Sequence, residues 1–175
     1  ANINLAMVSY YFGSKEKLLE AIFSYRGEAI KLKLERIVDQ KGMSSLEKVY
    51  MLVDHYIDKI LTRQCFHKIL SREQVLNNTG PIAGLILEMK MRNQEIISRL
   101  IKEGQDSGEF KPGIDISMMM ATMVGTATNL ITSKQYYKEL NGLQHLTEEE
   151  LQDHIREKLS KHLKHLFKIL LTNEA

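Results

Sequence analysis

Residues 10–23 read Tyr10-Tyr11-Phe12-Gly13-Ser14-Lys15-Glu16-Lys17-Leu18-Leu19-Glu20-Ala21-Ile22-Phe23. A glycine such as Gly13 is suited to end a helix, and the hydroxyl group of Ser14 is suited to cap the next one. Glu16 then falls in the first turn of that second helix, where the helix dipole favours an acidic side chain. The stretch therefore predicts a helix end, a tight turn and a long helix.

The rest of the chain also has the pattern of helices. It contains 2 Pro and 10 Gly among 175 residues, and its β-branched residues never form the alternating run typical of a strand. Capping and breaker residues predict helices over about residues 4–12, 14–40, 44–61, 66–76, 81–106, 115–133 and 147–172, with a polar link near 141–142. The predicted fold class is all-α.

Composition excludes few functions. The formal net charge of +2 neither requires nor excludes a nucleic-acid partner. Cys65 is the single cysteine, so it forms no internal disulfide and fits a reducing compartment. No run approaches the roughly 18 apolar residues of a membrane-spanning helix, and no leader is visible. We therefore expect a cytoplasmic protein without a membrane partner.

The predicted short helix at residues 4–12 has the features of a DNA-reading element. Asn4 is suited to cap it, and small residues at its front allow close approach to base edges. Tyrosine hydroxyl groups can donate hydrogen bonds to phosphate oxygens. Lys15 lies beside the free backbone N–H groups that open the next helix, a natural place for a phosphate contact.

Residues 1–23 resemble the second half of the helix-turn-helix of TetR-family regulators. The aromatic pair, Phe12, the Ser14-Lys15-Glu16 run and the paired leucines stand at the spacing of that family. A Gly-Glu-Phe turn at residues 108–110, before the penultimate helix, is also similar. The resemblance implies a partial DNA-binding domain with a connecting helix over residues 1–40, and an effector-binding and dimerisation domain over 41–175. It also implies that the first helices of the family's DNA-binding domain precede Ala1.

The resemblance implies contacts with double-stranded, palindromic operator DNA when those first helices are present. Ala6 and Met7 stand where the family reads bases. At the position of Ser9, a phosphate contact in the family, the family often has Tyr. The positions expected to hold phosphates are Ser9, Tyr10, Tyr11 and Lys15. The complete set of predicted DNA-binding residues is Asn4, Leu5, Ala6, Met7, Ser9, Tyr10, Tyr11 and Lys15.

Two helices near the C-terminus carry faces suited to association. Small residues at Ala121, Gly125 and Thr128 share one face of the penultimate helix and allow close approach of another helix. The last helix has an apolar stripe made of Leu151, Ile155, Leu159, Leu163, Leu166 and Leu170. The resemblance implies that both helices of two subunits form a four-helix homodimer interface. The alternative is that the stripe packs within its own domain.

Polar or soft side chains on otherwise apolar helix faces are candidates for an effector site. They are Asp54, His55 and Tyr56 on one helix, Met89, Arg92 and Asn93 on a second, and Met119, Met123 and Asn129 on a third. Methionine suits adaptable apolar pockets, so the set favours an apolar or amphipathic effector. The alternative for each residue is an ordinary place in the core or on the surface.

Other chemistry has little support in the sequence. His162 and His165 share a helix face, but no acidic or Cys partner stands at the usual metal-ligand offsets. Cys65 and His67 are two residues apart, without a third group for nucleophilic catalysis. We therefore expect no enzyme, metal or cofactor. The predicted function is a DNA-binding transcriptional regulator, a repressor that a small effector releases from its operator; the alternative is a helical small-molecule-binding or interaction module without DNA binding.

Overall fold

The structure, a computed structural model, describes residues 10–76 and 79–173. Seven helices are delimited within these ranges: α2 (Lys15–Val38), α3 (Ser45–Thr62), α4 (Gln64–Leu76), α5 (Pro81–Asp106), α6 (Ile116–Thr132), α7 (Lys134–Leu140) and α8 (Glu148–Leu171). The described residues contain no strand, which confirms the all-α fold class. None of their helices is long and apolar enough to cross a membrane.

Local capping explains where most of these helices begin. The Ser14 hydroxyl oxygen accepts the backbone N–H of Lys17 at 3.2 Å, at the start of α2. Capping boxes open α3 at Ser44 and α8 at Thr147, as the helix-start signals predict. The carboxylate of Asp115 caps α6 by accepting the backbone N–H of Met118 at 2.9 Å. Each of these capping side chains accepts a hydrogen bond from a backbone N–H that has no partner inside its helix.

Two features of the chain differ from the predicted helices. α4 begins at Gln64, two residues before the predicted start. α7 covers Lys134–Leu140, where no helix is predicted, and it has no side-chain cap and no buried residue. Because capping and amphipathic periodicity are the signals from which helices are predicted, a seven-residue helix that lacks both leaves no recognisable pattern.

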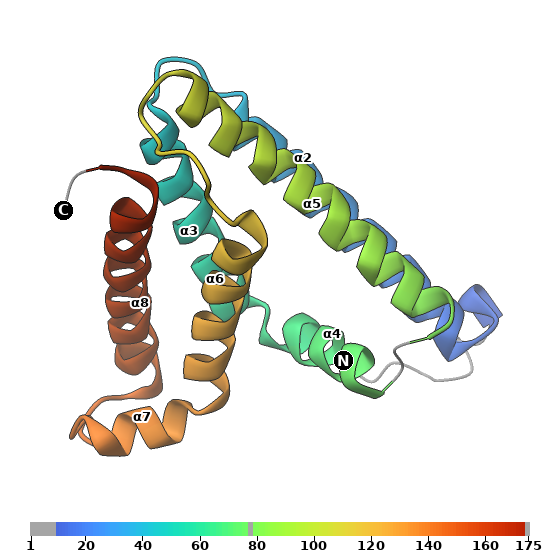
Figure 1. Cartoon of the computed structure of the whole chain (residues 1–175). Helices are drawn as coiled ribbons and strands as arrows, with labels where there is room; N and C mark the ends of the chain where they lie inside the picture. The colour runs from blue at the N-terminus through green and yellow to red at the C-terminus, as the bar shows by residue number, and fades with distance from the viewer. Residues whose placement is uncertain (1–9, 77–78, 174–175) are drawn as a thin grey trace.

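The helices form an arm and a bundle (Figure 1). α2 and α5 lie side by side along the arm, and both run away from the end where the chain enters α2. α3, α6 and α8 form the bundle, with α7 connecting α6 to α8 across one end. α4 follows α3 and reaches back toward the N-terminal end of the arm. The arm therefore extends from the bundle to the N-terminal residues that were predicted to read DNA.

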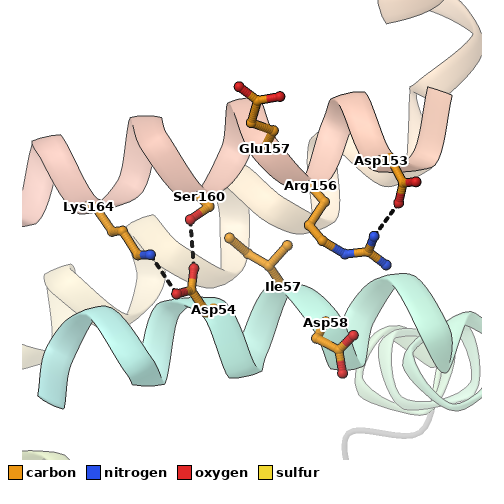
Figure 2. A pocket seen from close by; sticks show the side chains of 8 residues that line it. All are labelled: Asp54, Ile57, Asp58, Asp153, Arg156, Glu157, Ser160 and Lys164. Atoms are coloured by element: carbon orange, nitrogen blue, oxygen red, sulfur yellow. Dashed lines mark hydrogen bonds and ion pairs between the residues drawn. The ribbon is translucent and has the colours of Figure 1, made fainter. Parts of the chain in front are cut away.

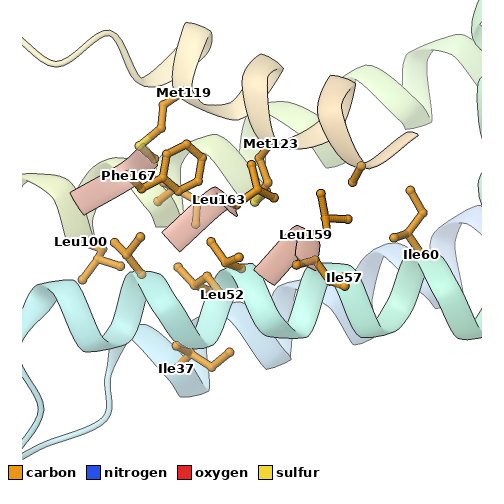
Figure 3. Packing of buried hydrophobic residues seen from close by; sticks show 14 of the residues in the cluster. Ile37, Leu52, Ile57, Ile60, Leu100, Met119, Met123, Leu159, Leu163 and Phe167 are labelled. Carbon is orange, nitrogen blue, oxygen red and sulfur yellow. The ribbon is translucent and has the colours of Figure 1, made fainter. Parts of the chain in front are cut away.

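The hydrophobic core lies where α3 meets α5, α6 and α8 (Figure 3). Ile57 of α3, Leu100 of α5 and Leu163 of α8 are fully buried there. Their helices contribute apolar residues at spacings of three and four, which is the pattern that places side chains on one helix face. This core fixes the positions of the helices that carry the predicted effector residues.

Candidate functional site

The predicted DNA-reading element is described only from Tyr10 onward. Residues 10–12 are helical, and Gly13 ends this turn with a φ of +76°, a conformation that glycine adopts without strain. Five predicted DNA-binding residues, Asn4, Leu5, Ala6, Met7 and Ser9, lie outside the described residues. The structure therefore shows only the end of the predicted reading helix.

The described part of this element presents its side chains to solvent. Tyr10 is 83% exposed and Tyr11 is 70% exposed, and their rings meet edge to face with centroids 5.3 Å apart. Lys15 is exposed at the first position of α2, close to the cap made by Ser14. Two hydroxyl groups and one ammonium group thus lie within one helical turn on either side of Gly13, free to contact an anionic surface.

Tyr56 of α3 lies at the centre of a half-buried polar cluster. Its ring lies edge to face on the ring of His67 of α4, with centroids 6.1 Å apart, and Thr128 of α6 lies near its hydroxyl group. The ring of Phe66, the neighbour of His67, packs against that of Phe23 of α2, with centroids 5.6 Å apart. The cluster therefore joins the bundle to the first half of α2.

Burial keeps this cluster uncharged at neutral pH. It raises the pKa of the Tyr56 hydroxyl group and lowers that of the His67 imidazole, because each charged form loses solvation. The pKa of His55 is also lowered, first by burial and then by Lys59 and Lys33. The sequence marks His67 only by its spacing from Cys65, because its contact with Tyr56 depends on how α4 folds back.

Two of the predicted effector residues on α5 carry buried polar atoms without a hydrogen-bond partner. These atoms are Nε of Arg92 and Oδ1 of Asn93. The guanidinium group of Arg92 pairs with Glu28 of α2, with Nη1 and Oε2 3.4 Å apart. Close packing beside Gly27 brings α2 against this part of α5. Unpaired buried polar atoms are rare in folded proteins, so both need a physical reason.

The remaining predicted effector residues have other places in the fold. Met89 of α5 is buried, and Met119 and Met123 of α6 belong to the hydrophobic core. Asn129 is exposed. The structure therefore gathers Tyr56 with His67, a residue missed in the sequence, and places Met119 and Met123 in the hydrophobic core.

Asp54 lies in an open groove between α3 and α8 rather than in the interior (Figure 2). Its carboxylate accepts hydrogen bonds from the Ser160 hydroxyl group at 2.6 Å and from the Lys164 ammonium group at 2.5 Å. The groove has a volume of about 590 Å³ and carries charges of both signs. Asp54 thus joins α3 to α8, and its place in the effector site stays a prediction.

The predicted dimer stripe of α8 is divided by the fold. Leu151, Ile155, Leu159 and Leu163 are at most 2% exposed and pack in the core of a single chain. Because their surfaces are already covered, these four cannot contact a second subunit, and the prediction is corrected in favour of its alternative. The two members toward the C-terminal end are less buried: Leu166 is half-buried and Leu170 is 37% exposed.

The small-residue face of α6 remains open in part. Ala121 and Gly125 are exposed, and no atom lies within 4 Å of a Cβ placed on Gly125. Thr128 is half-buried. No group of three or more His, Cys, Asp or Glu that could hold a metal ion lies together within the described residues.

A comparison with solved structures finds the same fold in another protein. The chain is similar to the crystal structure of the transcriptional regulator FadR from Bacillus subtilis in complex with stearoyl-CoA, with a TM-score of 0.62 and 17% sequence identity. The alignment covers 92% of this chain and 81% of that chain. No curated protein gives a significant match to the sequence. The likeness shows that the two chains share an all-helical fold.

The family follows from the sequence of the helical domain. Residues 46–161 match the model of the tetracyclin repressor-like C-terminal domain. The chain therefore belongs to the TetR family of transcriptional regulators, as the N-terminal resemblance predicts. The match covers the helices from α3 to the first half of α8, which are the helices that form the core and carry the candidate effector residues.

Proposed function

We propose that this protein is a DNA-binding transcriptional repressor that a small apolar or amphipathic effector releases from its operator. The exposed Tyr10, Tyr11 and Lys15 at the start of the arm are the observation that carries the proposal. These side chains offer hydrogen-bond donors to phosphate oxygens, and the domain behind them belongs to a family of regulators. Residues 1–40 would then carry DNA reading and its connection, and residues 41–175 effector binding and dimerisation.

The arm supplies a route from the effector to the DNA. α2 extends over Lys15–Val38 and packs along α5, the helix that carries Asn93. A rearrangement around Tyr56 and His67 would reach the N-terminal half of α2 through Phe66 and Phe23. An effector shifts the DNA-binding equilibrium only by the difference between its affinities for the two arrangements.

Dimerisation sets the geometry of operator recognition in this proposal. Two reading helices need a separation of about 34–36 Å to enter successive major grooves. We assign the contact to the open face of α6, with Ala121 and Gly125, and to the exposed C-terminal part of α8, with Leu170. A two-fold axis that runs along the direction of the arms would place both arms on the same side of the dimer.

The test is operator binding by the protein as its gene encodes it. A fluorescent duplex carrying the palindrome upstream of that gene is titrated with the parent protein and with a Tyr10→Ala plus Lys15→Ala variant. We expect the double substitution to weaken specific binding by about tenfold or more, because two phosphate contacts are lost. A matched control, Tyr136→Ala plus Lys102→Ala, removes an exposed tyrosine and an exposed lysine from α7 and α5. Specific binding that is equal in both variants would contradict the proposed reading surface.

Effector response is measured on the same complex. Stearoyl-CoA, the ligand in the FadR crystal, is the first probe, followed by single-chain amphiphiles. Release of the operator by a probe supports the repressor mechanism. Tighter operator binding in its presence would instead indicate an effector that acts as a co-repressor.

A further inference from the structure

An open groove lies where α4 ends and α5 begins, at the N-terminal end of the arm (Figure 1). Gln74 of α4 lines it together with the first turns of α5 and the residues just before them. Its volume of about 390 Å³ falls within the range of about 300–1,000 Å³ that is usual for small-molecule sites. The groove is therefore large enough for one small ligand.

The α5 side of this groove is apolar and has a lysine at one end. The residues of this helix that line it include Ala83, Ile86, Leu87 and Lys90. Their spacing of i, i+3, i+4 and i+7 places them on one face of the helix. Leu87 is 60% exposed, so apolar surface is open to the groove. From Gly80 to Lys90 the groove extends about 15 Å along the helix.

The end of α4 beside the groove also exposes apolar side chains. Val75 and Leu76 directly follow Gln74, and they are 79% and 63% exposed. Glu73, just before Gln74, is buried. Amphipathic helices usually bury apolar side chains and expose acidic ones, so the pattern is reversed here. The reversal leaves apolar surface uncovered next to the groove, and contact with an apolar ligand would remove part of it from water.

Lys90 is the one charged side chain among the described residues that line the groove. It is exposed, and its ammonium group forms no ion pair with a carboxylate in the part of the chain that the structure describes. An anionic head at the rim would meet this ammonium group without losing all of its hydration, so little desolvation opposes the contact. The groove thus complements a molecule with an apolar chain and an anionic head.

We propose that this groove binds a dissolved single-chain amphiphile, with its chain along Ile86 and Leu87 and its anionic head on the ammonium group of Lys90. The proposal rests on the effector-binding role given above, and it adds the place and the chemical class of the effector. A hollow of about 390 Å³ suits one chain, whereas contact with a membrane needs a continuous apolar face. The bound chain would lie against α4, which carries Phe66 and His67 near its other end.

The first test compares three ligands of one chain length. Octanoate, 1-octanol and octyltrimethylammonium are titrated below their micelle concentrations, without DNA, and the amide signals of the ¹⁵N-labelled protein are followed by NMR. We expect octanoate to bind about three- to fivefold more tightly than 1-octanol at low salt, the value of a partly exposed ion pair. High salt should reduce this preference, and octyltrimethylammonium should bind most weakly. Equal or tighter binding of 1-octanol at low salt would overturn the assignment of an anionic head.

Two substitutions locate the head and the chain of the ligand. Lys90→Gln removes the charge and should abolish the preference for octanoate over 1-octanol. Gly84→Leu should fill the groove and weaken the binding of both ligands by at least about tenfold. No atom lies within 4 Å of a Cβ on Gly84, so this variant is expected to fold. A preference that survives in Lys90→Gln, or octanoate binding that is unchanged in Gly84→Leu, would overturn the proposal.

Matched controls and two other occupants complete the design. Glu95→Leu and Lys161→Gln, at exposed positions of α5 and α8, should bind octanoate as the parent does. Binding to phosphatidylglycerol vesicles without binding of octanoate would assign the surface to a membrane and overturn the proposal. A mass that Gly84→Leu halves in sedimentation velocity would assign it to a second copy, with the same consequence.

The proposed function and the groove can fail separately. Octanoate that binds the groove and leaves the operator bound would support the groove and contradict release by this effector. Operator release by octanoate that persists unchanged in Gly84→Leu would support a repressor whose effector binds elsewhere, and it would overturn the groove.

Discussion

The carboxylate of Glu109 binds the first turn of α3 through the backbone of Ser45. Its Oε2 accepts the N–H of Ser45 at 2.8 Å, and its Oε1 accepts the N–H of Leu46 at 3.0 Å. The first N–H groups of a helix have no partner inside the helix and carry a partial positive charge. Glu109 lies in the turn between α5 and α6, so one side chain joins the start of α3 to the end of the arm.

Removal of this carboxylate should destabilise the fold. We expect Glu109→Ala to lower the free energy of unfolding by about 1–3 kcal/mol, because two partly buried N–H groups lose a charged acceptor. Glu109→Gln should lose less, since one amide oxygen still accepts. Urea denaturation followed by circular dichroism measures both. Glu95→Ala, at an exposed position of α5, is the control and should change stability by no more than about 0.5 kcal/mol. Equal losses at the two positions would contradict a special role for Glu109.

Gly104 in the last turn of α5 is required by the ring of Phe110. A Cβ on Gly104 would lie 2.2 Å from Cδ2 of that ring, far inside van der Waals contact. We expect Gly104→Ala to destabilise the protein by about 1–3 kcal/mol through overpacking. Gly84, near the start of the same helix, has nothing within 4 Å of such a Cβ. Gly84→Ala should therefore stabilise the protein, by up to about 1 kcal/mol. Melting temperatures that move in the same direction would show that Phe110 relaxes freely.

Local signals in the sequence predict most of the helices. Ser14, Ser44, Thr147 and Pro81 stand at or next to the helix starts, because a cap or a first-turn proline acts within three or four residues. The contact of Glu109 with Ser45 spans 64 positions, and no local pattern signals it. The resemblance of residues 108–110 to the family's turn points to this segment, but it does not show that Glu109 binds the start of α3.

The candidate sites were predicted less completely, for a related reason. The leucine stripe of α8 has the same periodicity whether it packs on its own α3 or on a second subunit, so the sequence left both alternatives open. Because Leu159 and Leu163 are buried within one chain, this part of the stripe packs inside its own domain. His67 joins the polar cluster only because α4 folds back onto α3, and that depends on tertiary packing.

The open face of α6 provides a test of the proposed dimer that spares the fold. We expect Gly125→Arg to convert the protein to a monomer, because a long charged side chain would enter a close helix contact between subunits. Within one chain the substitution meets open space, so the melting curve of the monomer should stay cooperative. Sedimentation velocity measures the change in mass. Gly84→Arg, at an equally open position of α5, should leave the mass of the parent unchanged. A dimer that persists in Gly125→Arg would move the interface away from this face.

Stability should fall in mild acid because of His67. Burial against Tyr56 and Phe66 lowers the pKa of its imidazole below the usual 6.5. In the unfolded chain this group takes up a proton near pH 6.5, and in the folded chain it does so only at lower pH, so the unfolded state binds more protons in that window. The contribution of His67 to stability is complete above pH 6.5, the pKa of the unfolded chain. It is lost as the pH falls from there through the lower pKa of the folded chain.

His67→Phe should reduce this loss, because phenylalanine keeps an aromatic ring beside Tyr56 and takes up no proton. His55, whose pKa is also lowered by burial, remains and should preserve part of the slope. The free energy of unfolding, measured between about pH 7.5 and pH 5.5, gives the slope for the parent and the variant. If the free energy of unfolding of the variant depends on pH as steeply as that of the parent, His67 is solvated in the folded chain. The junction between α3 and α4 would then be open to water.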